Sequence, residues 1–327
     1  MNETVHIEAM TISQKLAWLE ERYWRFGQDE ALIDHLEDLF GVDDEGNMTS
    51  EPRHDPLTGE TKGLMVLGGS GQGKTAQLKR LLRTNTVLTK FMYVDDLPSG
   101  NTLYVTVPPE ASLKKLAEII LELTGYDEIH PKLRAADAWE IGLLRFTLVG
   151  IKAVVIDECH HMLQSGPGKD VRTAIQSLKH VMQSDHGVAL IIAGVPALRD
   201  AIMSEPSRET YRRFAVHQLS KIRPDTHSSR LFASNFQKSA EILGLKMDAA
   251  DAFTERIQFA EHGEVGGCVA LAKEILREAI SRKRDELSLE YAERVFRKRN
   301  GEPGMTPFHS GHWTAVKGEL EAIGWVQ

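Results

Sequence analysis

The chain has 327 residues, of which 42% are apolar and 26% charged, and its formal net charge is −8, so we expect a packed globular protein with one large domain and a smaller one. The longest apolar run, 188–195, is far shorter than the roughly 20 residues that span a bilayer, and residues 1–11 resemble no signal peptide, so we expect neither a membrane protein nor a secreted one. Cys159 and Cys268 are widely spaced, which gives no disulfide framework and favours the cytoplasm.

The charge is unevenly distributed along the chain. Residues 1–61 carry 15 acidic and 4 basic side chains, whereas the remainder carries 32 acidic and 35 basic ones. The net acidity therefore lies in the N-terminal segment, and the overall value does not exclude nucleic-acid binding. Such a segment is either a solvated face or an arm that binds a partner and repels DNA from that surface.

The N-terminal segment has a helical pattern followed by a turn-rich one. Apolar residues at helical spacing predict a helix over 12–26 and a shorter one over 29–40. Residues 41–63 are rich in turn-forming residues and predict a linker or an exposed loop. We therefore interpret residues 1–62 as an acidic helical arm with a linker.

From residue 63 onwards, short apolar runs alternate with longer helical patterns. The runs predict strands at 64–67, 102–107, 153–156, 188–193 and 215–219. This alternation predicts an α/β fold, in which helices cover both faces of a parallel sheet, over a core at 63–220.

Beyond residue 221 the pattern is helical only. It predicts a small all-helical lid over 221–299, followed by a turn-rich tail over 300–327 that ends in a short helix at 312–323. The lid helices are expected near 226–243, 249–260, 266–283 and 288–298.

A glycine-rich loop separates the first core strand from the next helix in "LMVLGGSGQGKT". Its spacing is that of a P-loop, where glycines let backbone N–H groups turn towards a phosphate and the helix N-terminus adds its positive end. We expect Lys74 to neutralise the terminal phosphates of ATP and the Thr75 hydroxyl to ligate Mg²⁺. The predicted nucleotide-binding residues are Gly68, Gly69, Ser70, Gly71, Gln72, Gly73, Lys74 and Thr75.

The strand at 153–156 runs directly into the sequence "DECHH". Asp157 is predicted to hold Mg²⁺, directly or through water, and Glu158 to orient and activate the attacking water. The alternative is that this acidic pair caps a helix. Cys159, His160 and His161 could suggest zinc, but adjacent positions point in different directions on a helix or loop. We therefore interpret them as residues of packing or subunit contact.

The same Asp-Glu-Cys-His letters occur in the ATPase box of one group of helicases. Such a helicase needs two recA-like cores, but after residue 195 the chain offers one weak strand and a set of helices. The Ser-Ala-Thr motif expected after the acidic strand is also missing, because the next strand ends in "IIAGVP". A single P-loop core followed by a helical lid is instead the plan of the AAA+ ATPases.

Within that class the chain resembles the transposition regulators TniB and TnsC and, more distantly, MuB and IstB. The resemblance spans about residues 60–280 and rests on "LMVLGGSGQGKT", "TLYVTVPPEASLKKLAEIILELTG", "AVVIDECHHML", "ALIIAGVPAL", "RRF" and "HGEVGGCVALAKEIL". It implies a bacterial cytoplasmic protein, nucleoid-associated when on DNA, that hydrolyses ATP with Mg²⁺ and forms a homo-oligomeric ring or filament on double-stranded DNA. Such proteins link a target-selection protein to the transposase, and in a CRISPR-associated transposon the selector is TniQ-like. The alternatives are an AAA+ loader or remodelling motor, or a nucleotide-gated scaffold that binds no DNA.

The resemblance also implies roles for single residues. Arg213 matches the arginine finger, which contacts the γ-phosphate bound by the neighbouring subunit. Arg212 is the alternative finger, and an ordinary surface pair is the other interpretation. Residues 193–195 and 266–268 lack the polar and arginine sensors that this class often carries, so we expect a slow ATPase that depends on assembly.

Candidate DNA contacts are less distinctive, because sequence-independent binding needs only cations, hydroxyls and backbone N–H groups along the phosphates. Our first choice is Ser112, Lys114 and Lys115 at a predicted helix start, and our second is Lys132 and Arg134. The alternative is that these are routine exposed side chains. We interpret the basic run at 294–304 as a solvated helix end rather than a contact with DNA or transposase. Residues 305–313 either dock a partner or pack on the lid.

Overall fold

The computed structural model describes residues 10–126, 128–164, 168–183, 187–301 and 304–325. These residues divide into two compact units. The sheet unit contains residues 28–70 and 74–219, and the helical unit contains the chain up to residue 27, residues 71–73 and the chain from residue 220 onwards. Residues 1–9 of the predicted arm, 302–303 of the basic run and 326–327 of the tail lie outside the described residues.

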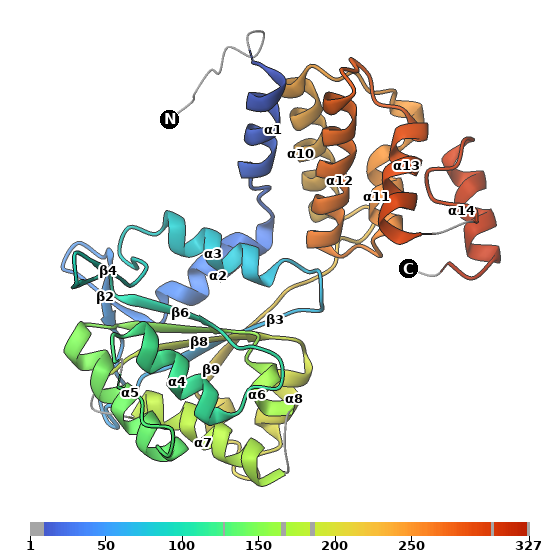
Figure 1. Cartoon of the computed structure of the whole chain (residues 1–327). Helices are drawn as coiled ribbons and strands as arrows, with labels where there is room; N and C mark the ends of the chain where they lie inside the picture. Colours follow the sequence, from blue (N-terminus) through green and yellow to red (C-terminus); the bar gives the residue numbers. More distant parts are fainter. Residues whose placement is uncertain (1–9, 127, 165–167, 184–186, 302–303, 326–327) are drawn as a thin grey trace. The chain divides into compact units, whose positions relative to one another are not determined.

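The sheet unit is built on five parallel strands in the order β6-β7-β8-β3-β9 (Figure 1). This finding confirms the predicted parallel α/β sheet, and each strand begins and ends within one residue of its expected range. The strands are β3 (Gly63–Leu67), β6 (Thr102–Thr106), β7 (Ala153–Asp157), β8 (Ala189–Gly194) and β9 (Phe214–Gln218).

Both faces of this sheet are covered, which explains why its strands read as continuous apolar runs. On β3, Leu64 and Val66 face one apolar cluster with α2 (Gly27–Glu37) and α3 (Lys74–Thr84). Met65 and Leu67 face the other cluster, which is formed by helices α4 (Leu113–Leu123), α5 (Ala135–Val149), α7 (Gly168–Gln183) and α8 (Ala197–Met203). The short helix α6 (His160–Gln164) follows β7, and the short helix α9 (Glu209–Arg212) precedes β9.

The sheet unit also contains two antiparallel hairpins that the sequence patterns do not predict. They are β1 (Phe40–Val42) with β2 (Met48–Pro52), and β4 (Met92–Val94) with β5 (Leu97–Ser99). The first corrects the linker or exposed loop expected over 41–63, because it occupies this range up to Pro52. The Asp43 carboxylate accepts the backbone N–H of Asn47 at 2.8 Å and so closes a turn between the two strands. Turn-forming residues are common to linkers and hairpins, so composition alone does not distinguish them.

The helical unit consists of α1 and the C-terminal helices. The helix predicted over 12–26 ends at Glu21, because Arg22 adopts an extended conformation. The extended stretch that follows buries Trp24 and Phe26, and the Trp24 ring lies 5.5 Å from that of Phe232. The helices are α1 (Ile12–Glu21), α10 (His227–Leu243), α11 (Phe253–Ala260), α12 (Val265–Ser281), α13 (Leu289–Asn300) and α14 (Trp313–Ala322).

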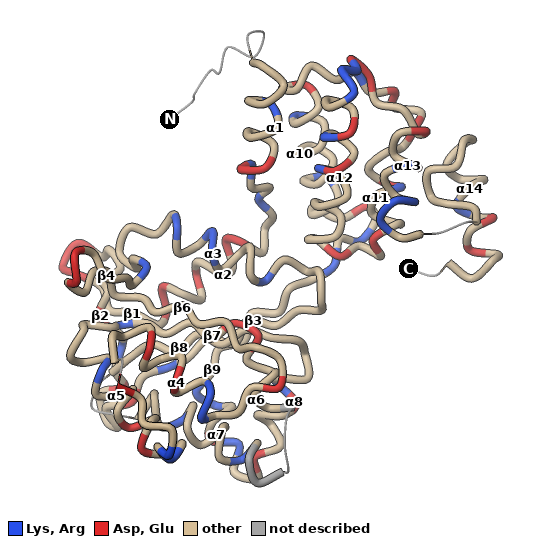
Figure 2. The backbone as a smooth tube through the Cα atoms, viewed as in Figure 1, with Lys and Arg blue, Asp and Glu red and all other residues tan. Residues whose placement is uncertain are grey.

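Residues 305–313 of the tail pack on the helices of the helical unit. This is one of the two alternatives given for them above; the other was docking of a partner. Phe308 is fully buried, and so is Arg256, whose guanidinium donates to the carbonyl oxygens of Pro307, His309 and Gly311 at 2.6–3.1 Å. Residues 294–300 of the basic run form the C-terminal half of α13 (Figure 2). The cations of its last turn, Arg297, Lys298 and Arg299, lie at the negative end of the helix dipole, which favours positive charge. Among the described helices, none is sufficiently long and apolar to cross a bilayer.

Candidate functional site

The glycine-rich loop connects β3 to α3, which begins at Lys74. Gly71 and Gly73 have φ angles of +77° and +89°, which glycine adopts without the strain that a side chain brings. Lys74 is only 5% exposed, and its ammonium donates to the carbonyl oxygens of Gly68 and Gly69 at 2.9 and 3.0 Å. Among the described residues these neutral carbonyls are its hydrogen-bond partners. A buried cation without a carboxylate partner fits an anionic ligand such as a phosphate.

The fully buried Asp157 lies at the carboxyl end of β7, where ligands bind in open parallel sheets. Its Oδ2 accepts hydrogen bonds from the Thr75 hydroxyl at 2.7 Å and from the Tyr104 hydroxyl at 2.6 Å. Its Oδ1 accepts the backbone N–H of Glu158 at 2.9 Å. A hydroxyl and a carboxylate this close together form a hard oxygen pair that fits Mg²⁺. The structure thus brings together Thr75 and Asp157, the two residues predicted to bind magnesium.

Sequence reasoning missed Tyr104, which lies on β6. Burial raises the pKa of Tyr104 above its usual range, and the hydrogen bond to the Asp157 carboxylate raises it further. The hydroxyl therefore stays protonated and donates to that carboxylate. The available signal was a tyrosine inside a buried strand, because a buried phenol needs a hydrogen-bond partner.

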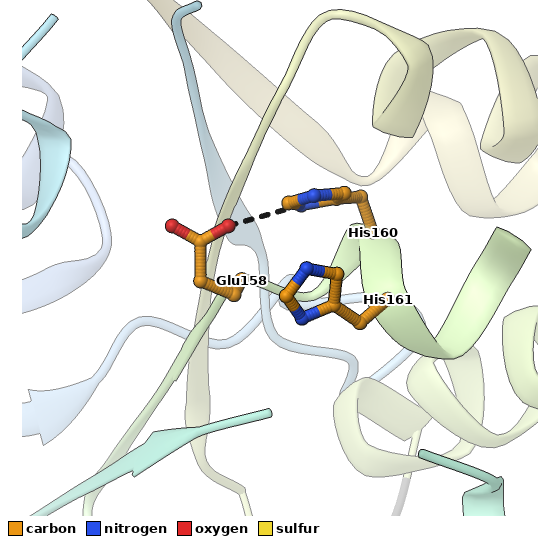
Figure 3. Close-up of side chains that lie close together, drawn as sticks. All are labelled: Glu158, His160 and His161. Carbon is orange, nitrogen blue, oxygen red and sulfur yellow. Dashed lines mark ion pairs between the residues drawn. The ribbon is translucent and has the colours of Figure 1, made fainter. Parts of the chain in front are cut away.

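Glu158 follows the strand in a left-handed conformation, with a φ of +55°. Its carboxylate Oε2 lies 3.3 Å from Nδ1 of His160 (Figure 3). Burial lowers the pKa of His160, and the neighbouring His161 lowers it further. The His160 ring also fills the space beside Gly194, where an added Cβ would lie 3.1 Å from its Nδ1. The end of β8 has no polar side chain of its own at Ala193, Gly194 and Val195. The imidazole of His160, from the start of α6, therefore lies beside it.

The expectation that Cys159, His160 and His161 point in different directions is confirmed for the cysteine and wrong for the histidines. Cys159 is fully buried in the core, and burial raises the pKa of its thiol to about 12, so it stays protonated. The two imidazole centroids are only 4.3 Å apart. Both histidines lie in the first turn of α6, and their side-chain rotamers bring the two rings together although the residues are consecutive.

The predicted finger pair is split between two environments. Arg213 is half-buried, and its Nη2 donates to Oε1 of Glu60 at 2.8 Å. This hydrogen bond lowers the pKa of Glu60, which holds the pair in its charged form. Arg212 ends α9 and is exposed, and its guanidinium forms no hydrogen bond or ion pair with the residues that the structure describes. In a single chain, Arg212 is therefore the more accessible of the two cations.

The two predicted groups of DNA-binding residues lie side by side in the sheet unit. Ser112 caps α4 by accepting the Lys115 N–H at 3.2 Å, and the Lys114 ammonium donates to the carbonyl of Pro131 at 3.0 Å. Lys132 is exposed. Nearby acidic side chains reduce the positive charge, since Lys115 lies 3.7 Å from Glu118 and Arg134 lies 2.7 Å from Asp137. The face is therefore only weakly basic.

Several solved structures have a similar fold. ORC1 from Aeropyrum pernix, in complex with DNA, gives a TM-score of 0.60 at 14% identity, covering 94% of this chain and 87% of that one. Cdc6p from Pyrobaculum aerophilum gives 0.57 at 16% identity, covering 85% and 69%. A Walker-type ATPase of Pyrococcus abyssi gives 0.52 at 14% identity, covering 93% and 76%. These likenesses confirm the predicted AAA+ fold with its C-terminal helical region.

The sequence also matches a family model. The model described as bacterial TniB protein matches residues 15–224, which includes the whole predicted P-loop core up to its last strand. No curated protein sequence matches the chain.

Proposed function

Because this chain belongs to the TniB family, we propose that it is an ATP-dependent regulator of transposition. In this proposal it assembles as a ring or filament on duplex target DNA and links a target-selection protein, of the TniQ type, to the transposase. The observation that carries the ATPase part is the convergence of Lys74, Thr75, Asp157 and Glu158 at the carboxyl end of the sheet. The DNA part is supported by the family and by the likeness to ORC1, whose structure contains DNA.

Each residue of this cluster has a defined task in the proposed reaction. ATP would supply the phosphoanhydride bond that is broken, and Mg²⁺ would supply positive charge that neutralises the phosphate oxygens. Lys74 exchanges its two loop carbonyls for phosphate oxygens, and Thr75 and Asp157 hold the metal. Tyr104 donates to Asp157 and so fixes the orientation of that carboxylate. Glu158 orients the attacking water and accepts its proton.

Assembly completes the reaction centre in this proposal. Arg213 can contact a phosphate on a neighbouring subunit only after it leaves Glu60, whereas Arg212 is exposed already. An arginine supplied by another subunit stabilises charge in the transition state and makes hydrolysis depend on contact between subunits. We keep Arg213 as the proposed finger because its position in the sequence matches the family pattern, with Arg212 as the alternative.

DNA binding is proposed for the weakly basic face formed by Ser112, Lys114, Lys115, Lys132 and Arg134. A single chain has little positive charge to offer there, since Glu118 and Asp137 lie within the same face. Many subunits on one duplex add their contacts, so assembly compensates for weak binding by each subunit. Strong dependence on salt concentration follows from contacts to phosphates.

The proposal is tested by electron microscopy of the full chain with duplex DNA and a non-hydrolysable ATP analogue. We expect rings or filaments on the DNA with the analogue and none with ADP. A Glu158→Gln variant should still assemble and recruit its partner, while its ATP hydrolysis is lost. Monomers under all of these conditions would contradict the proposal. Loss of DNA assembly in the Glu158→Gln variant, together with brisk strand separation by the natural protein, would instead identify a motor.

A further inference from the structure

Three side chains from the turn after β7 and the first turn of α6 converge beside β8: Glu158, His160 and His161 (Figure 3). One nitrogen or oxygen atom of each lies within 4.8 Å of the corresponding atoms of the other two. Separations of this size need only small side-chain movements to reach a common ion, because metal–nitrogen and metal–oxygen bonds are about 2.0–2.2 Å long. The cluster shares no residue with the predicted magnesium pair, Thr75 and Asp157, whose side chains are hydrogen-bonded to each other.

The backbone explains why these three residues meet. Glu158 has a φ of +55°, which turns the chain sharply after β7, and α6 begins two residues later at His160. The two histidines therefore occupy the first turn of α6 and face back towards the carboxylate. Gly194 leaves the space that the His160 ring fills, because an added Cβ would lie 3.0 Å from Leu198 and 3.1 Å from His160.

The rings of both histidines turn a nitrogen towards the centre of the cluster. Nδ1 of His161 lies 3.0 Å from the carbonyl oxygen of Val107, which can only accept, so this nitrogen is the donor. Figure 3 shows the other ring nitrogen of His161 facing Glu158 and His160. A metal-binding histidine typically has such an outer contact to a carbonyl. His160 is about nine-tenths buried, and its Nδ1 has no hydrogen-bond partner among the described residues, although it lies 3.3 Å from Glu158.

We propose that Glu158, His160 and His161 form a binding site for a divalent transition-metal ion of the zinc class. Two imidazoles and one carboxylate suit Zn²⁺ and Co²⁺, whereas Mg²⁺ prefers oxygen ligands alone. Three protein ligands leave at least one coordination position for water. If Glu158 is the catalytic base, which rests on the proposed function, an ion at this site occupies its lone pairs and holds ATP hydrolysis off.

The binding half of the proposal is tested without nucleotide, on the full chain freed of metal by chelation. Zn²⁺ is titrated in competition with a chromophoric chelator, and Co²⁺ is added as a spectroscopic probe of coordination. We expect one ion per chain. His160→Ala, His161→Ala and Glu158→Gln should each weaken Zn²⁺ binding by at least about 100-fold, because loss of an outer contact alone costs about 10- to 100-fold.

A matched control is His227→Ala, since His227 is exposed at the first position of α10 and lies in the helical unit. It should bind Zn²⁺ like the natural chain. Glu158→Gln keeps the size of the side chain, so it tests the site even if His160→Ala does not fold. Absence of stoichiometric Zn²⁺ binding, or binding that persists in a folded Glu158→Gln or His161→Ala variant, would overturn the site.

The regulatory half has a separate readout. In DNA-stimulated ATPase assays at constant Mg²⁺, Zn²⁺ should inhibit the natural chain at the concentrations that fill the site, and His161→Ala should need at least about 100-fold more. Equal inhibition of both proteins would overturn the regulatory role. A chain that binds Zn²⁺ as expected but has no ATPase activity under any condition would instead contradict the proposed function and leave the metal site standing.

Discussion

Replacing Tyr104 on β6 with Phe tests whether its hydroxyl stabilises the buried carboxylate of Asp157. The phenol donates to the fully buried Asp157 at 2.6 Å, and the carboxylate keeps two other donors, the Thr75 hydroxyl and the Glu158 N–H. A hydrogen bond to a charged group contributes about 1.5–3 kcal/mol, and the Phe ring leaves no cavity. We therefore expect the free energy of unfolding to fall by about 2 kcal/mol, which lowers the melting temperature of the sheet unit by about 4–8 °C.

The measurement is thermal and urea unfolding without nucleotide, followed by a double-mutant cycle with Asp157→Asn. The cycle should give a coupling energy of about 1–3 kcal/mol between residues 104 and 157. Tyr211→Phe is a suitable control, because Tyr211 is half-buried in the same unit and its hydroxyl has no hydrogen bond among the described residues. If Tyr104→Phe is as stable as this control, or if the coupling energy is zero, Tyr104 does not support Asp157.

Four further changes test other parts of the structure. Burial lowers the pKa of His217 to about 4, so the unfolded chain takes up a proton at higher pH than the folded chain does. The free energy of unfolding should therefore fall by about 3 kcal/mol between about pH 6.5 and about pH 4. Urea unfolding of His217→Gln should show a shallower dependence of this free energy on pH. Arg256→Met should lower the free energy of unfolding by about 3 kcal/mol or more and expose residues 304–313 to limited proteolysis, whereas Arg256→Lys should lose less. Arg213→Ala should abolish hydrolysis on DNA but keep fluorescent ATP-analogue binding by single chains, and an unchanged rate would move the finger to Arg212. A Lys114→Glu, Lys115→Glu double variant should weaken duplex binding and flatten its salt dependence, and unchanged values for both would place the DNA elsewhere.

Much of the fold follows from patterns that depend on neighbouring residues only. The apolar run before Gly68 and the helical spacing after Lys74 define β3 and α3 without reference to the rest of the chain. The proximity of Asp157 to the glycine-rich loop could be anticipated because Asp157 ends a buried strand and the carboxyl ends of parallel strands meet at one edge. Local patterns were sufficient wherever the place of a residue depends on one strand or loop.

The remaining features depend on backbone geometry or on distant partners. The left-handed turn at Glu158 brings its carboxylate beside His160, and no side-chain pattern announces a positive φ at a glutamate. Arg213 is held by Glu60, which lies in a stretch that the composition assigned to a linker. Trp24 is buried by an extended segment where helical periodicity still continues, because tertiary packing overrides a local preference.

The attachment of the tail has a consequence for how its sequence can vary. Arg256 donates to the carbonyl oxygens of Pro307, His309 and Gly311, and every amino acid carries that same acceptor. The arginine therefore recognises the path of the main chain rather than the identity of its side chains. Exchanges at His309 that keep this path should be tolerated, whereas deletion of a single residue from this stretch should remove all of the acceptors from register at once.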